Sequence, residues 1–574
     1  MNPEALQLME LTQEPKISYF SMEIGIHSSI PTYSGGLGVL AGDTIKSGAD
    51  LNLPMVAVTL ITKKGYFRQE LDSKGRQTEH PVLWDPVKSM TLLSPKVSVE
   101  IEGRRVLIQV WHYTVKSFTG GKVPVFFLDT DLEENAPEDR EITSFLYGKD
   151  LPYRLKQEIV LGLGGARMLK KLGFEIKKYH LNEGHASLLT LELLHNFQKP
   201  IEEVWDEKLV WDVNRVKELC VFTTHTPVEA GHDRFSYDLV RQILGEPIPF
   251  DVLKGLAGQE ALNMTLLALN LSEFVNGVAK KHGEVSRTMF PGYKINAITN
   301  GVHSYTWTCE SFKRLYDKYL PGWANEPELF VRIGRIPDQE IWEAHLEAKS
   351  ILFNYVRETT GVEMDPGLLT FGFARRATAY KRADLLFSDL ERLKTIGTGK
   401  IQIIYAGKAH PNDRPGKALI ENIFAFKEKL KSLIKIVYLP NYDMEVALKL
   451  VSGVDVWLNT PLRPREASGT SGMKAAHNGV VNFSVLDGWW IEGHIEGYTG
   501  WSIGPSPTET QLVDSFDTRD AEDLYNKLEK VIIPTFYQDN GIWVRMMQNA
   551  IGKNAYYFNT HRMMRRYVTE AYIR

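Results

Sequence analysis

Short runs of β-branched and aromatic residues alternate along the chain with longer amphipathic stretches. Apolar runs of this length, each followed by a turn rich in Gly, Ser, Thr or Asn, are typical of buried strands, and amphipathic stretches are typical of helices. Strands that alternate with helices form βαβ units, so the pattern predicts parallel sheets. The predicted strands are Ile17–Phe20, Val56–Ile61, Tyr179–Leu181, Leu219–Thr223, Leu368–Phe373, Ile401–Ala406, Ile434–Leu439, Val454–Leu458 and Val480–Val485. The predicted helices are Leu37–Leu51, His185–Phe197, Ala379–Leu393, Ala418–Leu433 and Met444–Val451.

The strand–helix pattern occurs as two series, which are joined near Asn300–Thr308. It predicts an α/β protein with two doubly wound, Rossmann-like domains that face each other, formed by residues 1–303 and 304–574. The segment Leu93–Val125 reads as an antiparallel insertion, because its strands alternate with a period of two. The helical, aromatic-rich tail Tyr525–Arg574 is expected to return to the first domain. Ligands of open α/β sheets bind beyond the carboxyl ends of the strands, so polar residues just after the strands are the functional candidates.

Composition narrows the class of protein further. A length of 574 residues is too great for one core, in agreement with two domains. The net charge of −4 argues against nucleic acid and anionic membranes as partners. Two cysteines cannot form a disulfide framework, which fits a reducing compartment. The N-terminus does not resemble a signal peptide, and the longest apolar runs have only the length of strands. We therefore expect a cytoplasmic enzyme without a membrane partner, and the oligomeric state, including a homo-oligomer, stays open.

A lysine follows a turn of small residues between the predicted strands Val454–Leu458 and Val480–Val485. The segment Glu466–Lys474 reads Glu-Ala-Ser-Gly-Thr-Ser-Gly-Met-Lys. Its small residues let the backbone approach a ligand, and the N–H groups at the start of the following helix favour an anion. A lysine in surroundings of low dielectric constant can lose its proton and form an imine with an aldehyde. The alternative is a Ser/Thr helix cap followed by a solvent-facing lysine.

Four cations lie near the end of another predicted strand, in the segment Phe371–Arg382. They are Arg375, Arg376, Lys381 and Arg382. Cations in the first turn of a helix oppose the helix dipole, which favours a bound anion such as phosphate. A solvated first helical turn is the alternative interpretation.

Further polar or glycine-rich segments also follow predicted strands. Ser34–Gly38 has a strand–turn–helix context, although many glycine-rich turns are merely tight turns. His225 follows the strand Leu219–Thr223, and on its own it is typical of a hydrogen-bonded structural residue. Asn182, Glu183 and His185 follow the strand Tyr179–Leu181 in the same way.

Together these segments resemble the glycogen, starch and maltodextrin phosphorylase family. The resemblance includes the lysine segment, the basic segment, the glycine loop and the His225 segment. It extends to Asn276–Lys280, Thr299–Val302, Asn441-Tyr442, Asn478-Gly479 and Leu486–Gly488, in the family's order. It implies the two-domain fold known as GT-B. Ser34, Val39, Thr378 and Ala379 differ from the residues common in the family, so no side-chain contact is carried over to these positions.

The resemblance implies pyridoxal 5'-phosphate as the cofactor, carried as a Schiff base on Lys474, and no metal. Arg376 would hold the substrate phosphate, and Lys381 would lie near both phosphates. The expected catalytic residues are Lys474, Arg376, Lys381 and His225. The expected cofactor-binding residues are Lys474, Arg375, Lys381, Thr470, Ser471, Gly472, Tyr442, Trp307 and Gly36. The expected substrate-binding residues are Gly35, Gly36, Leu37, His225, Asn300, Tyr380, Glu466, Ser468 and Gly469, with Asn300 on the sugar 6-hydroxyl and Glu466 on the 3-hydroxyl.

The activity that the resemblance implies is reversible phosphorolysis of α-1,4-glucans. A glucosyl unit would move from a glucan or maltodextrin end to inorganic phosphate with retention, giving α-D-glucose 1-phosphate. A retaining glycosidase usually needs two carboxylates, but only Glu466 stands in the small-residue loop. The cofactor phosphate is therefore expected to support proton transfer. No long regulatory extension precedes the first strand of the sequence, so control by phosphorylation is not expected.

Two other functions fit the same fold. A nucleotide-sugar glucan glucosyltransferase often carries two glutamates eight positions apart at this turn, the second of which binds ribose. Here the residue eight positions after Glu466 is Lys474, which argues against that function. A non-catalytic glucan-binding protein is the third possibility, and the retained lysine and cationic segment argue against it.

Overall fold

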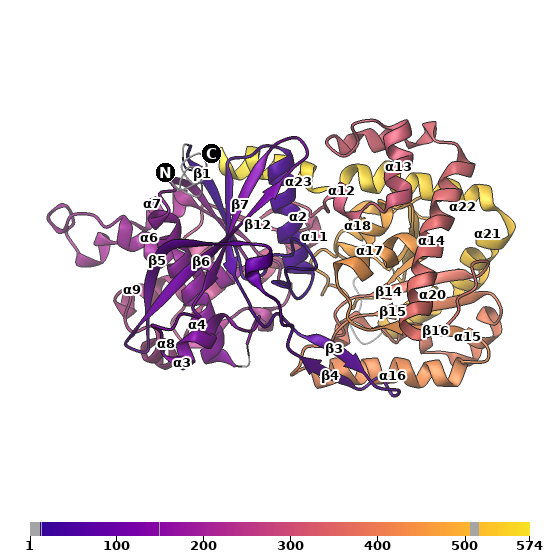
Figure 1. Ribbon diagram of the computed structural model, residues 1–574, viewed down its shortest axis with the longest axis horizontal. Helices are drawn as coiled ribbons and strands as arrows, with labels where there is room; N and C mark the ends of the chain where they lie inside the picture. Colours follow the sequence, from indigo (N-terminus) through magenta and orange to yellow (C-terminus); the bar gives the residue numbers. More distant parts are fainter. Residues whose placement is uncertain (1–11, 13, 149, 506–515, 574) are drawn as a thin grey trace.

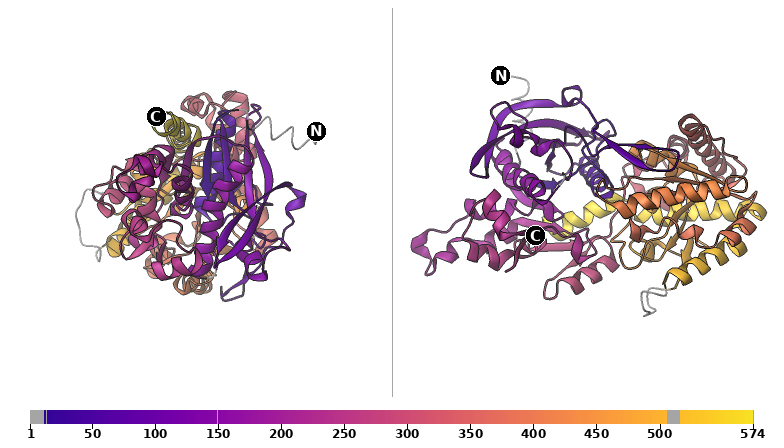
Figure 2. Two further views of the ribbon diagram at one scale, coloured as in Figure 1. Left: turned by 90° about the vertical axis from the view of Figure 1, so that its left-hand side faces the viewer. Right: turned by 90° about the horizontal axis from the view of Figure 1, so that it is seen from below.

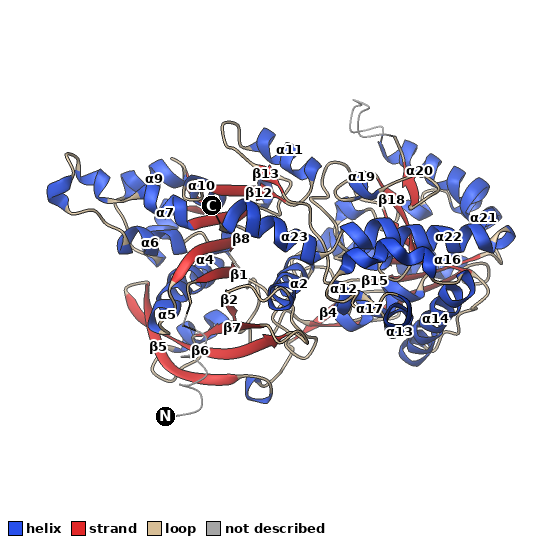
Figure 3. Cartoon of the chain, turned by 90° about the horizontal axis from the view of Figure 1, so that it is seen from above, coloured by secondary structure: helices blue, strands red, loops and turns tan. Residues whose placement is uncertain are grey.

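The computed structural model describes residues 12, 14–148, 150–505 and 516–573. Two large sheets lie side by side along the molecule, each accompanied by its own helices (Figures 1 and 3). The first has the strand order β13-β12-β9-β8-β1-β2-β7-β6-β5, and the second has the order β16-β15-β14-β17-β18-β19. None of the described helices is long and apolar enough to cross a membrane.

The first sheet combines a parallel part with an antiparallel edge. β1 is buried along its whole length and lies between two parallel neighbours, as is usual for the central strand of a parallel sheet. β5, β6 and β7 pair antiparallel, which confirms the predicted insertion, and β7 joins β2 in parallel. The strands are β1 Lys16–Ser21, β2 Met55–Leu60, β5 Thr91–Ile101, β6 Arg104–Lys116, β7 Lys122–Asp129, β8 Ile176–Asn182, β9 Cys220–Thr223, β12 Phe274–Gly277 and β13 Asn296–Ala297. The main helices are α2 Gly36–Asp50, α4 Leu151–Ile159, α5 Gly165–Lys171, α6 Leu189–Asn196, α7 Val213–Leu219, α8 Tyr237–Ile243, α9 Phe250–Ala257, α10 Met264–Asn270 and α11 Lys280–Met289.

The second sheet is parallel throughout. The sequence pattern does not predict the short strands β12, β13 and β19. The strands are β14 Leu369–Ala374, β15 Ile401–Ala406, β16 Lys435–Leu439, β17 Val456–Asn459, β18 Val481–Val485 and β19 Gly500–Ile503. The main helices are α12 Ser304–Trp307, α13 Glu310–Tyr319, α14 Asp338–Thr360, α15 Leu390–Gly397, α16 Arg414–Leu430, α17 Met444–Gly453, α18 Ser471–Ala476, α20 Phe516–Lys527, α21 Ile533–Gln538, α22 Asn540–Asn549 and α23 Thr560–Tyr567.

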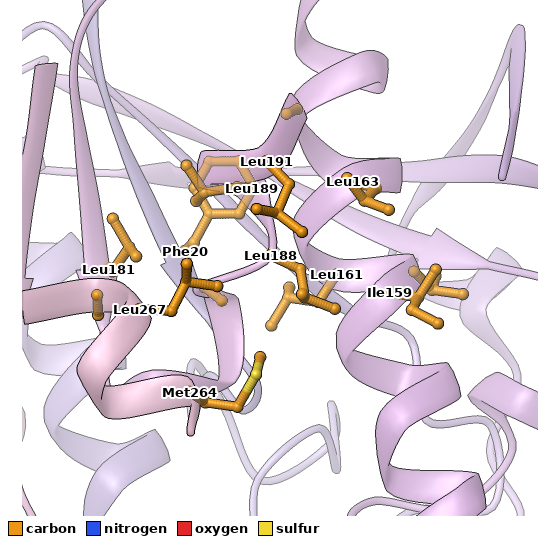
Figure 4. Close-up of a cluster of buried hydrophobic side chains, with 14 of the residues drawn as sticks. Phe20, Ile159, Leu161, Leu163, Leu181, Leu188, Leu189, Leu191, Met264 and Leu267 are labelled. Atoms are coloured by element: carbon orange, nitrogen blue, oxygen red, sulfur yellow. The ribbon is translucent and has the colours of Figure 1, made fainter. Parts of the chain in front are cut away.

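Each sheet is anchored by apolar packing on its own helices. Figure 4 shows part of the first core, where Phe20 of β1 and Leu181 of β8 meet Leu161, Leu189 and other buried side chains. Burial of each such side chain contributes about 1.5–3 kcal/mol. The sheets are therefore rigid supports for the loops at their carboxyl edges.

The C-terminal helices extend from the second sheet back to the first (Figure 2). Met564, Tyr567 and Tyr572 pack in the core beside β1 and α2. The Tyr572 hydroxyl lies 2.6 Å from His180 Nδ1, and both groups are buried. His561 Nε2 lies 2.9 Å from Asp50 Oδ2 at the end of α2. The tail thus joins two parts of the molecule that lie far apart in sequence.

A small hairpin forms a second connection between the two sheets. Its strands are β3 Arg68–Leu71 and β4 Gln77–His80, and it lies against the second sheet's helices in Figure 1. The Gln69 backbone N–H donates to Asn441 Oδ1 at 2.6 Å, and the Asn441 backbone N–H donates to Gln69 Oε1 at 3.0 Å. The side-chain amide of Gln69 donates to the Gly407 carbonyl at 3.0 Å. The hairpin therefore fixes the loops after β15 and β16.

Candidate active site

The Lys474 amine is buried on α18, beyond the carboxyl end of β17. Nζ lies 3.9 Å from the centre of the Trp307 ring, and the Trp307 indole N–H donates to Asp43 Oδ2 at 2.8 Å. Burial lowers the pKa of Lys474 to about 8, although the charge of Asp43 opposes this effect. Within the described residues the amine has no hydrogen-bond partner. A buried amine in this state can react with an aldehyde.

Two of the predicted cations meet Glu466 beside this lysine segment. Lys381 Nζ lies 3.0 and 2.8 Å from the two Glu466 oxygens, and Arg375 donates to Glu466 at 2.5 Å. Arg375 also donates to the Asn459 side chain at the end of β17. Burial raises the pKa of Glu466, but the two cations outweigh burial and lower it to about 2. The arrangement therefore concentrates positive charge around a single buried carboxylate.

Arg376 differs from its neighbours because it is exposed. The part of the chain that the structure describes offers it no ion pair. Its charge acts on groups of the first half of the chain. Burial raises the pKa of Tyr147 well above its usual value and that of Tyr66 to about 12, and Arg376 opposes both shifts. Arg376 therefore lies within electrostatic reach of residues in both halves of the chain, including His410 of the second half, and is available to an anion.

The glycine loop precedes α2, which begins at Gly36. The Ser34 and Gly35 N–H groups donate to the Glu23 carboxylate, at 2.5 and 3.2 Å. Among the described residues, no acceptor is found for the N–H groups of Gly36 and Leu37. The start of α2 therefore retains backbone donors that suit an anion.

His225 and Asn300 lie in loops after β9 and β13. His225 Nε2 lies 2.7 Å from Asn182 Oδ1, and its backbone N–H donates to Glu183 at 2.8 Å. Burial lowers the pKa of His225 to about 3, so the ring is neutral. Asn300 Oδ1 is buried and has no hydrogen-bond partner within the described residues. A buried acceptor of this kind is costly unless a ligand donates to it.

The remaining predicted residues lie either in the lysine segment itself or near Lys381 and Arg375, the two cations that contact it. The Tyr380 ring centre lies 4.4 Å from Lys381 Nζ. Burial raises the pKa of Tyr442, which also experiences the charge of Arg375. Gly469 has a φ of +70°, which favours glycine, and a Cβ at Gly472 would lie 2.3 Å from Asn482 Oδ1. The structure also places Ser468, Thr470 and Ser471 in this segment, immediately before and at the start of α18.

The predicted helix Ala379–Leu393 is wrong. A short turn covers Ala379–Lys381, a second turn follows at Leu385–Phe387, and α15 begins only at Leu390. Arg382 ends the first turn with a φ of +47°. Its guanidinium donates to the carbonyls of Thr460 and Pro461 and to Asp517 and Asp520. These bonds hold the backbone away from a helix, so no helix dipole acts on these cations.

Two carboxylates of this region were not predicted from the sequence. Glu23 follows β1 and contacts the glycine loop, as described above. Asp487 follows β18, and its Oδ2 accepts from the Glu466 backbone N–H at 2.9 Å. Burial raises the pKa of Asp487 to about 7, with a contribution from the charge of Glu466. Their positions just after strands are the one signal in the sequence that could have indicated them.

Comparison with known proteins shows that this chain is similar to carbohydrate phosphorylases. A family model described as carbohydrate phosphorylase matches residues 250–498. Maltodextrin phosphorylase of Thermococcus litoralis is 41% identical, over 100% of this chain and 72% of the relative. Glycogen phosphorylase of Aquifex aeolicus is 36% identical, over 98% of this chain and 87% of the relative. Glycogen phosphorylase of Mycobacterium tuberculosis is 37% identical, over 97% of this chain and 70% of the relative.

Proposed function

The chain belongs to the carbohydrate phosphorylase family, and we propose that it transfers the terminal glucosyl unit of an α-1,4-glucan to inorganic phosphate. The observation that carries the proposal is the position of the Lys474 amine, buried and without a hydrogen-bond partner among the described residues, at the same sheet edge as Arg375 and Lys381. A lysine for an aldehyde cofactor and cations for phosphate occur together there. We place the boundary between the two domains at residues 303 and 304.

The residues around Lys474 fit pyridoxal 5'-phosphate. The amine can attach to the aldehyde, and Trp307 offers aromatic surface beside it. Tyr442, a buried ring within electrostatic reach of Arg375, would contact the cofactor as well. Gly472 keeps the backbone of the segment free of a side chain, while Thr470, Ser471 and Gly36 would contribute polar groups. When bound, this cofactor supplies a phosphate monoester with a second pKa of about 6, which suits proton exchange near neutral pH.

The cations have separate tasks in this proposal. Arg375 would hold the cofactor phosphate, Arg376 would hold the substrate phosphate, and Lys381 would lie near both. Two phosphates repel each other, and fixed cations offset that repulsion without having to reorganise. Glu466 contacts Arg375 and Lys381 and would accept a hydrogen bond from the sugar 3-hydroxyl. The catalytic set is Lys474, Arg376, Lys381 and His225.

The remaining groups would orient the sugar. Asn300 Oδ1 is buried without a donor, and the sugar 6-hydroxyl would supply one. His225 is held by Asn182 and Glu183 and would contact the glucose ring as a neutral group. Tyr380 and the backbones of Ser468 and Gly469 would flank the sugar. In the glycine loop the N–H groups of Gly36 and Leu37 would face the phosphate, with the backbone of Gly35, whose N–H donates to Glu23, beside them.

The proposed reaction retains the configuration of the anomeric carbon. A retaining glycosidase would need two free carboxylates, with its nucleophile close to the bond that breaks. Glu466 is bound by two cations, and Asp487 is turned to the backbone of Glu466. We therefore propose that the departing 4-hydroxyl receives its proton from inorganic phosphate, supported by the cofactor phosphate.

The test is an NMR analysis of the products. Protein loaded with pyridoxal 5'-phosphate is incubated with maltoheptaose and inorganic phosphate, and the anomeric signal of the product is recorded. The proposal expects α-D-glucose 1-phosphate from the start of the reaction. The β-anomer would contradict retention. Transfer from UDP-glucose or ADP-glucose, without phosphorolysis, would favour a nucleotide-sugar transferase.

A further inference from the structure

The Glu23 carboxylate is bound by the glycine loop itself. Its side chain is only 2% exposed, and both of its oxygens accept hydrogen bonds. Oε2 accepts from the Ser34 and Gly35 N–H groups at 2.5 and 3.2 Å, and the Ser34 hydroxyl lies 3.2 and 3.1 Å from the two oxygens. A carboxylate thus binds the loop's first donors, at a place where backbone N–H groups usually bind a ligand anion.

This contact divides the donors of the loop into two sets. The N–H groups of Ser34 and Gly35 are used by Glu23, whereas among the described residues those of Gly36 and Leu37 have no acceptor. At Gly38 a Cβ would lie 2.7 Å from Glu23 Oε2, so a side chain there would displace the carboxylate. The loop is therefore closely fitted to Glu23.

Tyr147 fixes the other oxygen of Glu23. Its hydroxyl donates to Oε1 at 2.5 Å, and the Arg154 guanidinium carbon lies 4.3 Å from the centre of its ring. Tyr147 has a φ of +67°, a left-handed conformation that is costly for an aromatic residue. Such strain persists where surrounding contacts impose it, and here the contacts lead from Arg154 to the glycine loop.

We propose that Glu23 is a positioning residue for phosphate, with Tyr147 acting through it. By holding the first two N–H groups of the loop, Glu23 sets the orientation in which Gly36 and Leu37 direct theirs toward a phosphate oxygen. Arg376, an exposed cation that follows β14, lies within electrostatic reach of Tyr147. This inference rests on the proposed phosphorolysis, because it concerns the phosphate of that reaction.

The test compares the kinetics of Glu23→Gln and Tyr147→Phe with those of the wild-type holoenzyme. Glu23→Gln keeps one acceptor oxygen but places an NH₂ group among donors. We expect its KM for inorganic phosphate to rise about tenfold, the factor for one hydrogen bond to a charged group, with KM for maltoheptaose nearly unchanged. Tyr147→Phe should raise the same KM by a smaller factor, and the double variant should resemble Glu23→Gln alone.

The matched control is Glu133→Gln, which removes an exposed carboxylate and should leave both KM values unchanged. An unchanged KM for phosphate in both Glu23→Gln and Tyr147→Phe would overturn the proposal. Equal increases in both KM values would also overturn it, because they would indicate general loosening. If Glu23→Gln does not fold, the KM of Tyr147→Phe for inorganic phosphate alone decides whether the proposal holds. A wild-type holoenzyme without phosphorolysis would instead refute the proposed function.

Discussion

Lys474 is unusual among lysines because its amine is buried on an aromatic ring instead of being solvated. Burial lowers its pKa to about 8, so at pH 7 about a tenth of the amine is neutral, far more than for a lysine with the ordinary value. The surroundings thus prepare the amine for an aldehyde. The sequence predicted this lysine from its segment, but not the Asp43–Trp307 contact, which joins residues far apart in the chain.

The first prediction concerns the pH dependence of cofactor attachment. The rate at which protein without cofactor binds pyridoxal 5'-phosphate covalently should rise about tenfold per pH unit below pH 8 and level off above it, because only the neutral amine attacks. Stopped-flow absorbance would measure this rate. Lys474→Arg keeps the charge beside Trp307 and should give no covalent chromophore. A rate that still rises steeply at pH 9.5 would contradict the lowered pKa.

The second prediction concerns Glu466. Its pKa of about 2 lies below the ordinary value, so its ion pairs stabilise the fold fully above about pH 4.5, and this contribution is lost as the pH falls toward 2. Glu466→Gln should lower the free energy of unfolding by about 3 kcal/mol at pH 7, because the buried Lys381 and the partly buried Arg375 lose their partner. The difference from wild type should shrink below pH 4.5 in urea denaturation. A difference independent of pH would refute the ion-pair explanation.

The candidate site was predictable at the residue level where a polar side chain follows a strand. Arg375, His225 and Asn182 were found in this way, because parallel strands bring their carboxyl ends to one edge. Glu23 and Asp487 also follow strands, but a carboxylate that accepts from backbone N–H groups has no distinctive spacing in sequence. Their partners are set by tertiary contacts.

Among the elements, the buried parallel strands were the most predictable. β14 and β15 match the predicted ranges to within a residue, because a run buried on both faces is mostly apolar. The helix after β14 was predicted wrongly, since propensity does not reveal that Arg382 is bound to carbonyls and carboxylates of distant segments. Tertiary contacts decided the conformation there.

The third prediction concerns the hairpin of β3 and β4. Gln69 is 1% exposed and contacts Asn441 and Gly407. Gln69→Ala would remove the acceptor of the partly buried Asn441 N–H and one of the two donors to the Gly407 carbonyl, which among the described residues keeps only the Tyr438 hydroxyl. We expect a loss of about 2 kcal/mol in the free energy of unfolding. Arg68→Ala, on the same strand but exposed, should change stability by less than about 0.5 kcal/mol. Equal losses in the two variants would contradict a role for Gln69 in joining the sheets.

At the scale of the whole molecule, the helices of the C-terminal tail connect the second sheet to the first. Tyr572 contacts His180 of β8, whose other ring nitrogen lies 2.8 Å from Thr223 Oγ1. The sequence of the tail predicted helices that return to the first domain, but not which residues they contact, because aromatic residues pack equally well on many apolar surfaces.

The fourth prediction tests this connection. Tyr572→Phe keeps the ring but removes a buried hydrogen bond, so the free energy of unfolding should fall by about 1–2 kcal/mol. Tyr556→Phe, on a partly exposed ring of the same tail, is the control and should have almost no effect. Urea denaturation would compare the two, and an unchanged Tyr572→Phe protein would show that the contact does not stabilise the tail.

The most direct test of the proposed function is the phosphate-dependent release of glucose 1-phosphate from maltodextrins of graded length. Wild-type protein loaded with pyridoxal 5'-phosphate should release it in proportion to enzyme concentration and only when inorganic phosphate is present. Lys474→Ala should bind no covalent cofactor and release none. Release by Lys474→Ala at the wild-type rate, or no release by the loaded wild type at any chain length, would contradict the proposal that this lysine segment serves phosphorolysis.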